Sequence, residues 1–179
     1  VPEGDNALFQ LEAARALSPR DPGVARLEQA INARILSEAR NAAIKGDAAG
    51  ANNWLKLGAE RKLPAAELDI VRSALATAQG TARSAELARL STIVTDLLIR
   101  GRNDDAALEA ARTALVNLRT YEGNGPTTHA MQDRLASALV THGRALLDAG
   151  KLDEAQKALT DAQGLGAVVE ATASLASAI

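Results

Sequence analysis

The residues that could do chemistry are few, and their spacing favours no catalytic or metal-binding arrangement. The sequence has no cysteine and two histidines, His129 and His142. On one α-helix their separation corresponds to a rotation of about 1300°, so the two imidazoles would point about 140° apart. They could share a metal ion only with ligands from another segment. We therefore expect no metal site, with His129 near water and His142 partly buried.

Two pairs of neighbouring carboxylates resemble a general acid and base: Asp104 with Asp105, and Asp153 with Glu154. Each pair stands where a helix is expected to begin, and negative charge there offsets the helix dipole and caps free amides. The segment 123–126 is glycine-rich but lacks the Lys-Ser/Thr of a phosphate loop, so it predicts a turn. No serine stands in a nucleophile motif. We therefore expect a protein that is not an enzyme.

The composition argues against several kinds of partner. A net charge of −2 provides no strong field for polyanions, so we expect no nucleic-acid binding. No apolar run approaches the ~18 residues of a membrane-spanning helix, so we expect no direct membrane insertion by this segment. Aromatic residues make up 2% of the chain, which removes the usual stacking platforms for cofactors. We therefore expect no cofactor.

Helix signals run along the whole sequence, and no stretch alternates with period two. The expected helices cover residues 5–17, 22–45, 47–62, 64–100, 104–119, 127–149, 153–164 and 168–178. The stretch 64–100 could be two helices if Gly80 ends the first. Because a glycine inside a helix costs only about 1 kcal/mol relative to alanine, one continuous helix is favoured.

The helix boundaries are predicted from caps and breakers. Asp5, Asp21 and Asp47 are expected to cap the first three helices, and Pro22 suits the first position of the second. Apolar stripes predict the buried faces. In the first helix this stripe includes Leu8, Leu11 and Leu17. Thr127 or Thr128 is expected to cap the helix that ends near Ala149.

Three glycine turns, at Gly46, Gly101 and Gly150, precede segments that begin with acidic residues and alanine. Around Gly150, large and small residues alternate at helical spacing. These are Leu139, Gly143 and Leu146 before the turn, and Ala155, Leu159 and Ala162 after it. This pattern resembles the tetratricopeptide repeat (TPR), in which small residues stand where two helices cross closely and large ones fill the gaps between hairpins.

Other segments match the same pattern: the first helix fits the second half of a repeat even better, and the match around Gly101 is poorer. Around Gly46 the matching residues are Ile35, Ala39, Ala42, Ala51 and Leu55. Around Gly101 they are Leu90, Val94, Leu97, Ala106 and Ala110. The first helix resembles the second half of a repeat through Ala7, Leu11, Ala14 and Pro19. The turns lie 55 and 49 residues apart, unlike the ~34 of the standard repeat.

The resemblance implies an all-α fold, an irregular TPR-like α-solenoid of antiparallel helical hairpins. It would form a single domain over 1–179, with a half repeat at 1–20, hairpins at about 22–63, 64–120 and 127–166, and a terminal helix at 167–179. Another helical bundle is the alternative. In TPR proteins the first helix of each hairpin lines a concave groove. Arg40 and Arg144 occupy equivalent groove positions, where they could hold a carboxylate-bearing partner; Thr95 takes that place in the middle hairpin.

The N-terminal order of residues 2–22, followed by a long Ala/Arg helix, resembles the helical-repeat region of TonB-type bacterial energy transducers. That resemblance implies a periplasmic location, whereas the absence of cysteine fits the cytosol and the periplasm equally. We expect a non-enzymatic scaffold for protein–protein interaction, whose groove binds a peptide or partner helix. The alternative is a structural spacer or oligomerisation region of a larger bacterial envelope protein, in which a second copy of the chain is a partner.

Overall fold

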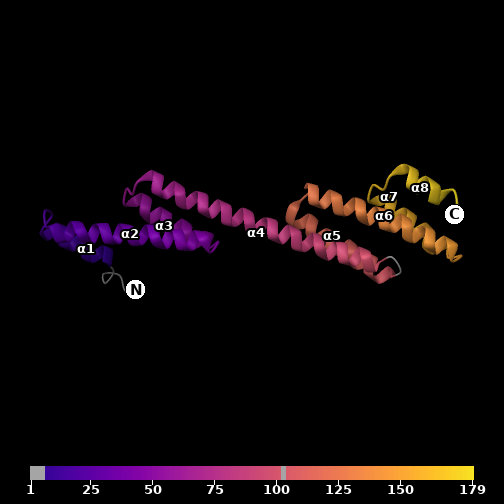
Figure 1. Ribbon diagram of the computed structural model, residues 1–179, viewed down its shortest axis with the longest axis horizontal. Coiled ribbons are helices and arrows are strands. Elements are labelled where there is room, and N and C mark those ends of the chain that lie inside the picture. Colours follow the sequence, from indigo (N-terminus) through magenta and orange to yellow (C-terminus); the bar gives the residue numbers. More distant parts are fainter. Residues whose placement is uncertain (1–6, 102–103) are drawn as a thin grey trace. The chain divides into compact units, whose positions relative to one another are not determined.

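The computed structural model describes residues 7–101 and 104–179, and within these ranges every regular element is an α-helix (Figure 1). The helices are α1 (Ala7–Leu17), α2 (Pro22–Ile44), α3 (Ala48–Glu60), α4 (Ala65–Arg100), α5 (Asp105–Glu122), α6 (Pro126–Asp148), α7 (Leu152–Gly164) and α8 (Val169–Ala176). The all-α prediction is confirmed. The finer prediction of a TPR-like solenoid stays a prediction.

The helices fall into two compact units that divide between Arg83 and Ser84, inside α4. The helix itself is uninterrupted from Ala65 to Arg100, as the low cost of Gly80 led us to expect. The predicted hairpins 22–63 and 127–166 each lie within one unit, whereas the predicted hairpin 64–120 crosses the division. The continuous single domain therefore stays a prediction.

In the first unit α2 packs along α3, and the two are joined by a tight turn in which Gly46 has a φ of 73°. The buried cluster consists of Ile35, Ala39, Ala43, Ala51, Leu55, Leu63, Leu68, Val71 and Leu75. Its small residues bring the helices close together. At Gly58 of α3 an added Cβ would lie 2.9 Å from Cδ2 of Leu68.

Helix α1 contributes one buried residue, Leu11. The predicted stripe is wrong at Leu17, which is 85% exposed because it stands at the last residue of the helix, before the turn to α2. Of the other positions in the proposed half repeat, Ala7 and Pro19 are exposed and Ala14 is partly buried. Helix α1 therefore makes only a narrow contact with α2.

In the second unit α6 is central and contacts α5, α7 and α8 (Figure 1). The buried cluster consists of Val94, Leu108, Ala111, Leu115, Leu118, Met131, Leu135, Leu139, Val140, Leu159, Ala162 and Leu175. At Gly143 of α6 an added Cβ would lie 3.4 Å from Cβ of Ala158 and 2.8 Å from Cδ2 of Leu175. Three helices meet at this position.

The repeat pattern around Gly101 is wrong by one residue in α5. Ala106 and Ala110 are exposed, and the buried alanines are Ala107 and Ala111. The reason is the rest of the helix, because the stripe that includes Ala107 and Ala111 continues into the buried Leu115 and Leu118. Burial of these two leucines fixes the rotation of the helix.

Several predicted caps are confirmed. The carboxylates of Asp21, Asp47 and Asp104 accept hydrogen bonds from the amides of Gly23, Gly50 and Ala106, respectively, near the starts of α2, α3 and α5. Pro22 is the first residue of α2. The predicted cap at Asp5 lies outside the described residues.

The predicted threonine cap of α6 is wrong. Its N-cap is Gly125, and the first-turn amides of Thr127 and Thr128 donate to the carboxylate of Glu122 at 3.3 Å and 2.6 Å. Glu122 can reach them because α5 continues to Glu122 rather than ending near Arg119. Burial acts to raise the pKa of Glu122, but the hydrogen bonds with Thr128 and Thr127 hold that pKa below its ordinary value.

Candidate functional site

The three residues predicted to line a partner groove lie in different units. Arg40, on α2 of the first unit, forms an ion pair with Glu67 of α4. Both side chains are partly exposed, at 45% and 40%. Arg40 therefore already holds a carboxylate of its own chain.

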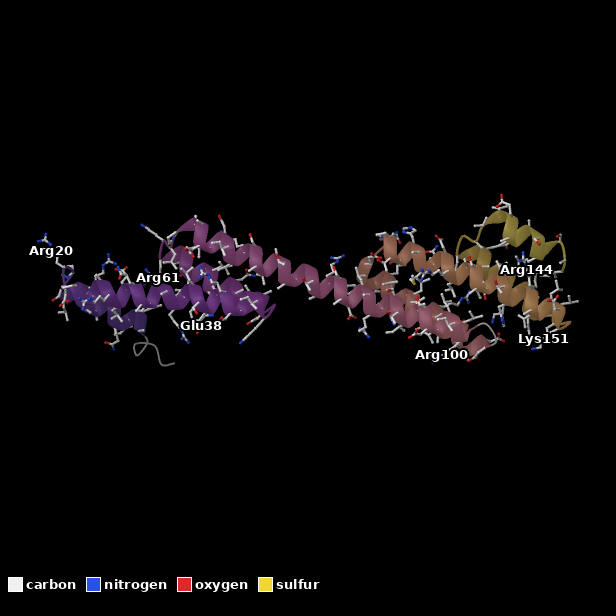
Figure 2. The ribbon with its side chains drawn as sticks, in the orientation of Figure 1. Arg20, Glu38, Arg61, Arg100, Arg144 and Lys151 are labelled. Atoms are coloured by element: carbon white, nitrogen blue, oxygen red, sulfur yellow. The ribbon has the colours of Figure 1, made fainter. Side chains whose placement is uncertain are left out.

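Thr95 and Arg144 belong to the second unit, on α4 and α6. The hydroxyl of Thr95 is partly buried, donates to the carbonyl oxygen of Ser91 at 2.9 Å, and lies 3.7 Å from Sδ of Met131. Arg144, labelled in Figure 2, is exposed and has no ion-pair partner among residues 7–101 and 104–179. A single groove built from Arg40, Thr95 and Arg144 stays a prediction.

Thr95 lines a groove of about 690 Å³ between α4 and α6 of the second unit, called here the α4/α6 groove. Helix α4 contributes Thr95, Leu98 and Ile99, and α6 contributes Asp133, Arg134, Ser137, Ala138, Thr141, His142 and Ala145. Four of the seven α6 side chains are alanine, serine or threonine, and they lie beside an apolar wall formed by Leu98 and Ile99 of α4. Ile99 in that wall is 63% exposed.

Along α6 the α4/α6 groove presents side chains to a partner, because the backbone amides and carbonyls in the middle of that helix bond to one another. Leu98 and Ile99 lie in the last turn of α4, which ends at Arg100, and the carbonyls of a last turn have no partner within the helix. The side chains of Asp133 and Arg134 have no hydrogen bond or ion pair among the described residues, so both charges are available to a partner. The groove therefore combines apolar surface with one free charge of each sign.

A second, smaller cleft of about 150 Å³ lies between α5, α6 and α7. Arg112 of α5 lies 2.8 Å from Asp161 of α7 and 3.5 Å from Glu109. Burial acts to lower the pKa of Arg112, but its pairing with Asp161, reinforced by Glu109, raises that pKa above the ordinary value. The pair of Arg112 with Asp161 joins α5 to α7 and engages two of the charged groups that line the cleft.

His142 lies between the cleft and the α4/α6 groove and lines both. Its side chain is 11% exposed, its Nε2 is 2.5 Å from the carboxylate of Asp105, and its Nδ1 is buried without a hydrogen-bond partner. Sequence reasoning assigned Asp105 only to a helix start. Since the two residues lie on different helices, no local pattern pairs them. Among the described residues no group of three or more His, Asp or Glu could hold a metal ion.

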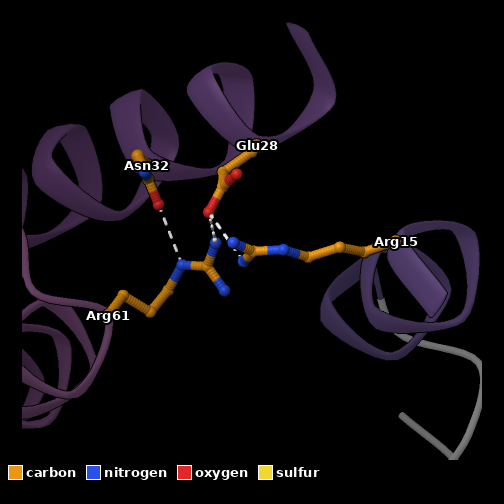
Figure 3. Close-up of polar contacts among 4 residues, drawn as sticks. All are labelled: Arg15, Glu28, Asn32 and Arg61. Atoms are coloured by element: carbon orange, nitrogen blue, oxygen red, sulfur yellow. Dashed lines mark hydrogen bonds and ion pairs between the residues drawn. The ribbon is translucent and has the colours of Figure 1, made fainter. Parts of the chain in front are cut away.

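A polar cluster in the first unit also went unpredicted (Figure 3). Nε of Arg61, just after α3, donates to Oδ1 of Asn32 on α2 at 2.8 Å. Oε1 of Glu28 lies 3.5 Å from a guanidinium nitrogen of Arg61 and 3.5 Å from one of Arg15 on α1. Glu28 therefore links three helical segments.

The described residues provide apolar surface, small side chains, charged groups without a partner and internal ion pairs. None of the described helices combines the length and apolar character needed to cross a bilayer. Comparison of the chain with protein-family models, with curated proteins and with solved structures found no match.

Proposed function

We propose that this protein is a non-enzymatic interaction scaffold whose α4/α6 groove binds a partner helix or peptide. The observation that carries the proposal is the α6 face of the groove, where Ser137, Ala138, Thr141 and Ala145 place small side chains beside the apolar wall of α4. Small residues allow a second helix, or a large apolar side chain, to approach closely.

The dimensions of the α4/α6 groove suit a short helical partner. Between Arg134 and Ala145 the α6 face extends about 16 Å, at 1.5 Å per residue, which corresponds to about three turns of a partner helix. Addition of a β-strand is excluded as a binding mode here, since it requires an open sheet edge. Leu98 and Ile99 would contact the apolar face of the partner, and Arg134 would donate to the carboxylate of an acidic residue at one end.

The test uses the full chain and two displayed libraries, one of amphipathic helices and one of linear peptides. Ala145 is exposed and lines the groove, whereas Ala110 is exposed on α5 and lies outside it. We expect selected binders to lose at least about tenfold in affinity, or about 1.4 kcal/mol, with Ala145→Arg, because the new side chain fills the groove. The matched variant Ala110→Arg should bind like the parent.

Enrichment of no binder from either library would contradict the proposal. Binders that respond equally to the two arginine variants would also contradict it. Helical circular dichroism of both variants checks that the fold is retained.

A structural spacer or oligomerisation region of a larger envelope protein, such as a TonB-type energy transducer, is the second candidate. Residues 76–86 of α4 favour this role. None of them is buried, and a helical segment that contributes to no core can act as a spacer. Light scattering over a range of concentrations distinguishes the roles: a monomer that selects no partner supports a spacer, and a stable dimer supports assembly.

A further inference from the structure

The middle of α4 is a helical segment that belongs to neither hydrophobic cluster. Leu75 is the last α4 residue in the cluster of the first unit, and Leu87 is the first that packs against the cluster of the second. Residues 76–86, called here the connecting stretch, contain no buried residue. The division between the two units, at Arg83 and Ser84, falls inside the connecting stretch.

The connecting stretch is also weak by its own sequence. Gly80 lies in the helix interior, and a Cβ added there would meet no atom within 4 Å, so packing does not require a glycine. Glycine is the poorest helix former after proline, and threonine is among the weaker ones. The hydroxyls of Thr77 and Thr81 donate to the carbonyls four residues earlier, at 2.9 Å and 3.0 Å. Such bonds slightly destabilise and bend helices.

Little else stabilises this segment. Most helical stability in proteins comes from tertiary packing, and an isolated helix shorter than about 12–15 residues is marginal in water. The ion pair of Glu86 with Arg89 ties the end of the connecting stretch only to the next turn of the same helix. Apart from Ala78 and Glu86, which are partly buried, the residues of the connecting stretch are exposed.

We propose that the connecting stretch opens locally as a helix–coil hinge while both hydrophobic clusters remain folded. The free energy of local opening is set by the segment itself, because no buried contact must break. Opening is independent of any ligand in the α4/α6 groove, so this inference does not rest on the proposed function.

Hydrogen exchange of the full chain, followed by mass spectrometry, tests the hinge. Amides of residues 76–86 should exchange at least about 100-fold faster than those of the core segments around Val71 and Leu139, the range expected between local and global opening. Gly80→Ala should slow exchange in the stretch by about fivefold and leave the core segments unchanged. Gly164→Ala, at an exposed glycine with no neighbour within 4 Å, is the matched control and should leave the stretch unchanged.

Limited trypsin digestion of the full chain gives a second readout. Arg83 lies in the connecting stretch, while Arg72 and Arg89 lie on the parts of α4 that flank it. Cleavage after Arg83 should be at least about tenfold faster than after either of these. Equal cleavage at the three arginines, or exchange in the stretch as slow as in the cores, would overturn the hinge.

Discussion

Gly143 of α6 lies against Ala158 of α7 so closely that a Cβ on the glycine would be 3.4 Å from the Cβ of the alanine. The same added carbon would be 2.8 Å from Cδ2 of Leu175, which is 1% exposed. Buried atoms on both sides therefore limit the size of the side chain that this crossing accepts.

Gly143→Leu should destabilise the protein by about 1–3 kcal/mol, since the larger side chain overpacks the junction of α6, α7 and α8. The measurement is the urea midpoint of unfolding. Gly80→Leu is the matched control: a Cβ there meets no atom within 4 Å, and the gain in helix propensity predicts a small increase in stability. A neutral Gly143→Leu would show that the three helices do not meet as closely as described.

Arg112 and Asp161 should couple α5 to α7. Their side chains are 28% and 25% exposed and 2.8 Å apart, so a double-mutant cycle with Arg112→Met and Asp161→Asn should give an interaction of about 1 kcal/mol or more. The exposed pair Arg72 and Asp69 provides the comparison. Its cycle should give about 0.5 kcal/mol or less, and equal values for the two pairs would contradict the prediction.

Glu122 should make stability depend on pH in the acid range. Its hydrogen bonds with Thr128 and Thr127 hold the pKa lower in the folded protein than in the unfolded chain, despite the opposing effect of burial. This contribution to stability is fully present above the pKa of Glu122 in the unfolded chain, near 4.3. It is lost as the pH falls through the lower pKa of Glu122 in the folded protein.

Urea unfolding of the parent and of Glu122→Gln at pH 7 and pH 3 tests this prediction. The parent should be the more stable protein at pH 7, and the difference should narrow at pH 3. Thr128→Val removes one donor to the carboxylate. In this background, the stability difference between Glu122 and Glu122→Gln should change less between pH 7 and pH 3. A difference that is equal at both pH values would argue against an ionised carboxylate as the cap.

Arg61 should stabilise the first unit. It is 15% exposed and bonds to Asn32 and Glu28, so Arg61→Met should destabilise that unit by about 1–2 kcal/mol. Arg15, which meets the same glutamate but is 64% exposed, provides the control. Arg15→Met should change stability by about 0.5 kcal/mol or less. Hydrogen exchange in α2 and α3 reports the effect, and faster exchange with Arg15→Met than with Arg61→Met would contradict this ranking.

The sequence alone determined the helices and several of their ends. The caps at Asp21, Asp47 and Asp104 and the turn at Gly46 depend on atoms only a few residues apart, so a local pattern is sufficient to predict them. The continuity of α4 was predicted on the same basis, from the small cost of one glycine. Of the predicted groove residues, only Thr95 lines the α4/α6 groove.

The tertiary structure decided which face of each helix is buried and which charges meet. Burial in α5 follows Leu115 and Leu118, which places Ala107 inside and Ala106 outside. Arg40 is paired with Glu67 because α2 and α4 come together in the first unit. Such pairings depend on which helix lies alongside another, and helices distant in sequence come together through packing of their apolar faces rather than through any local signal.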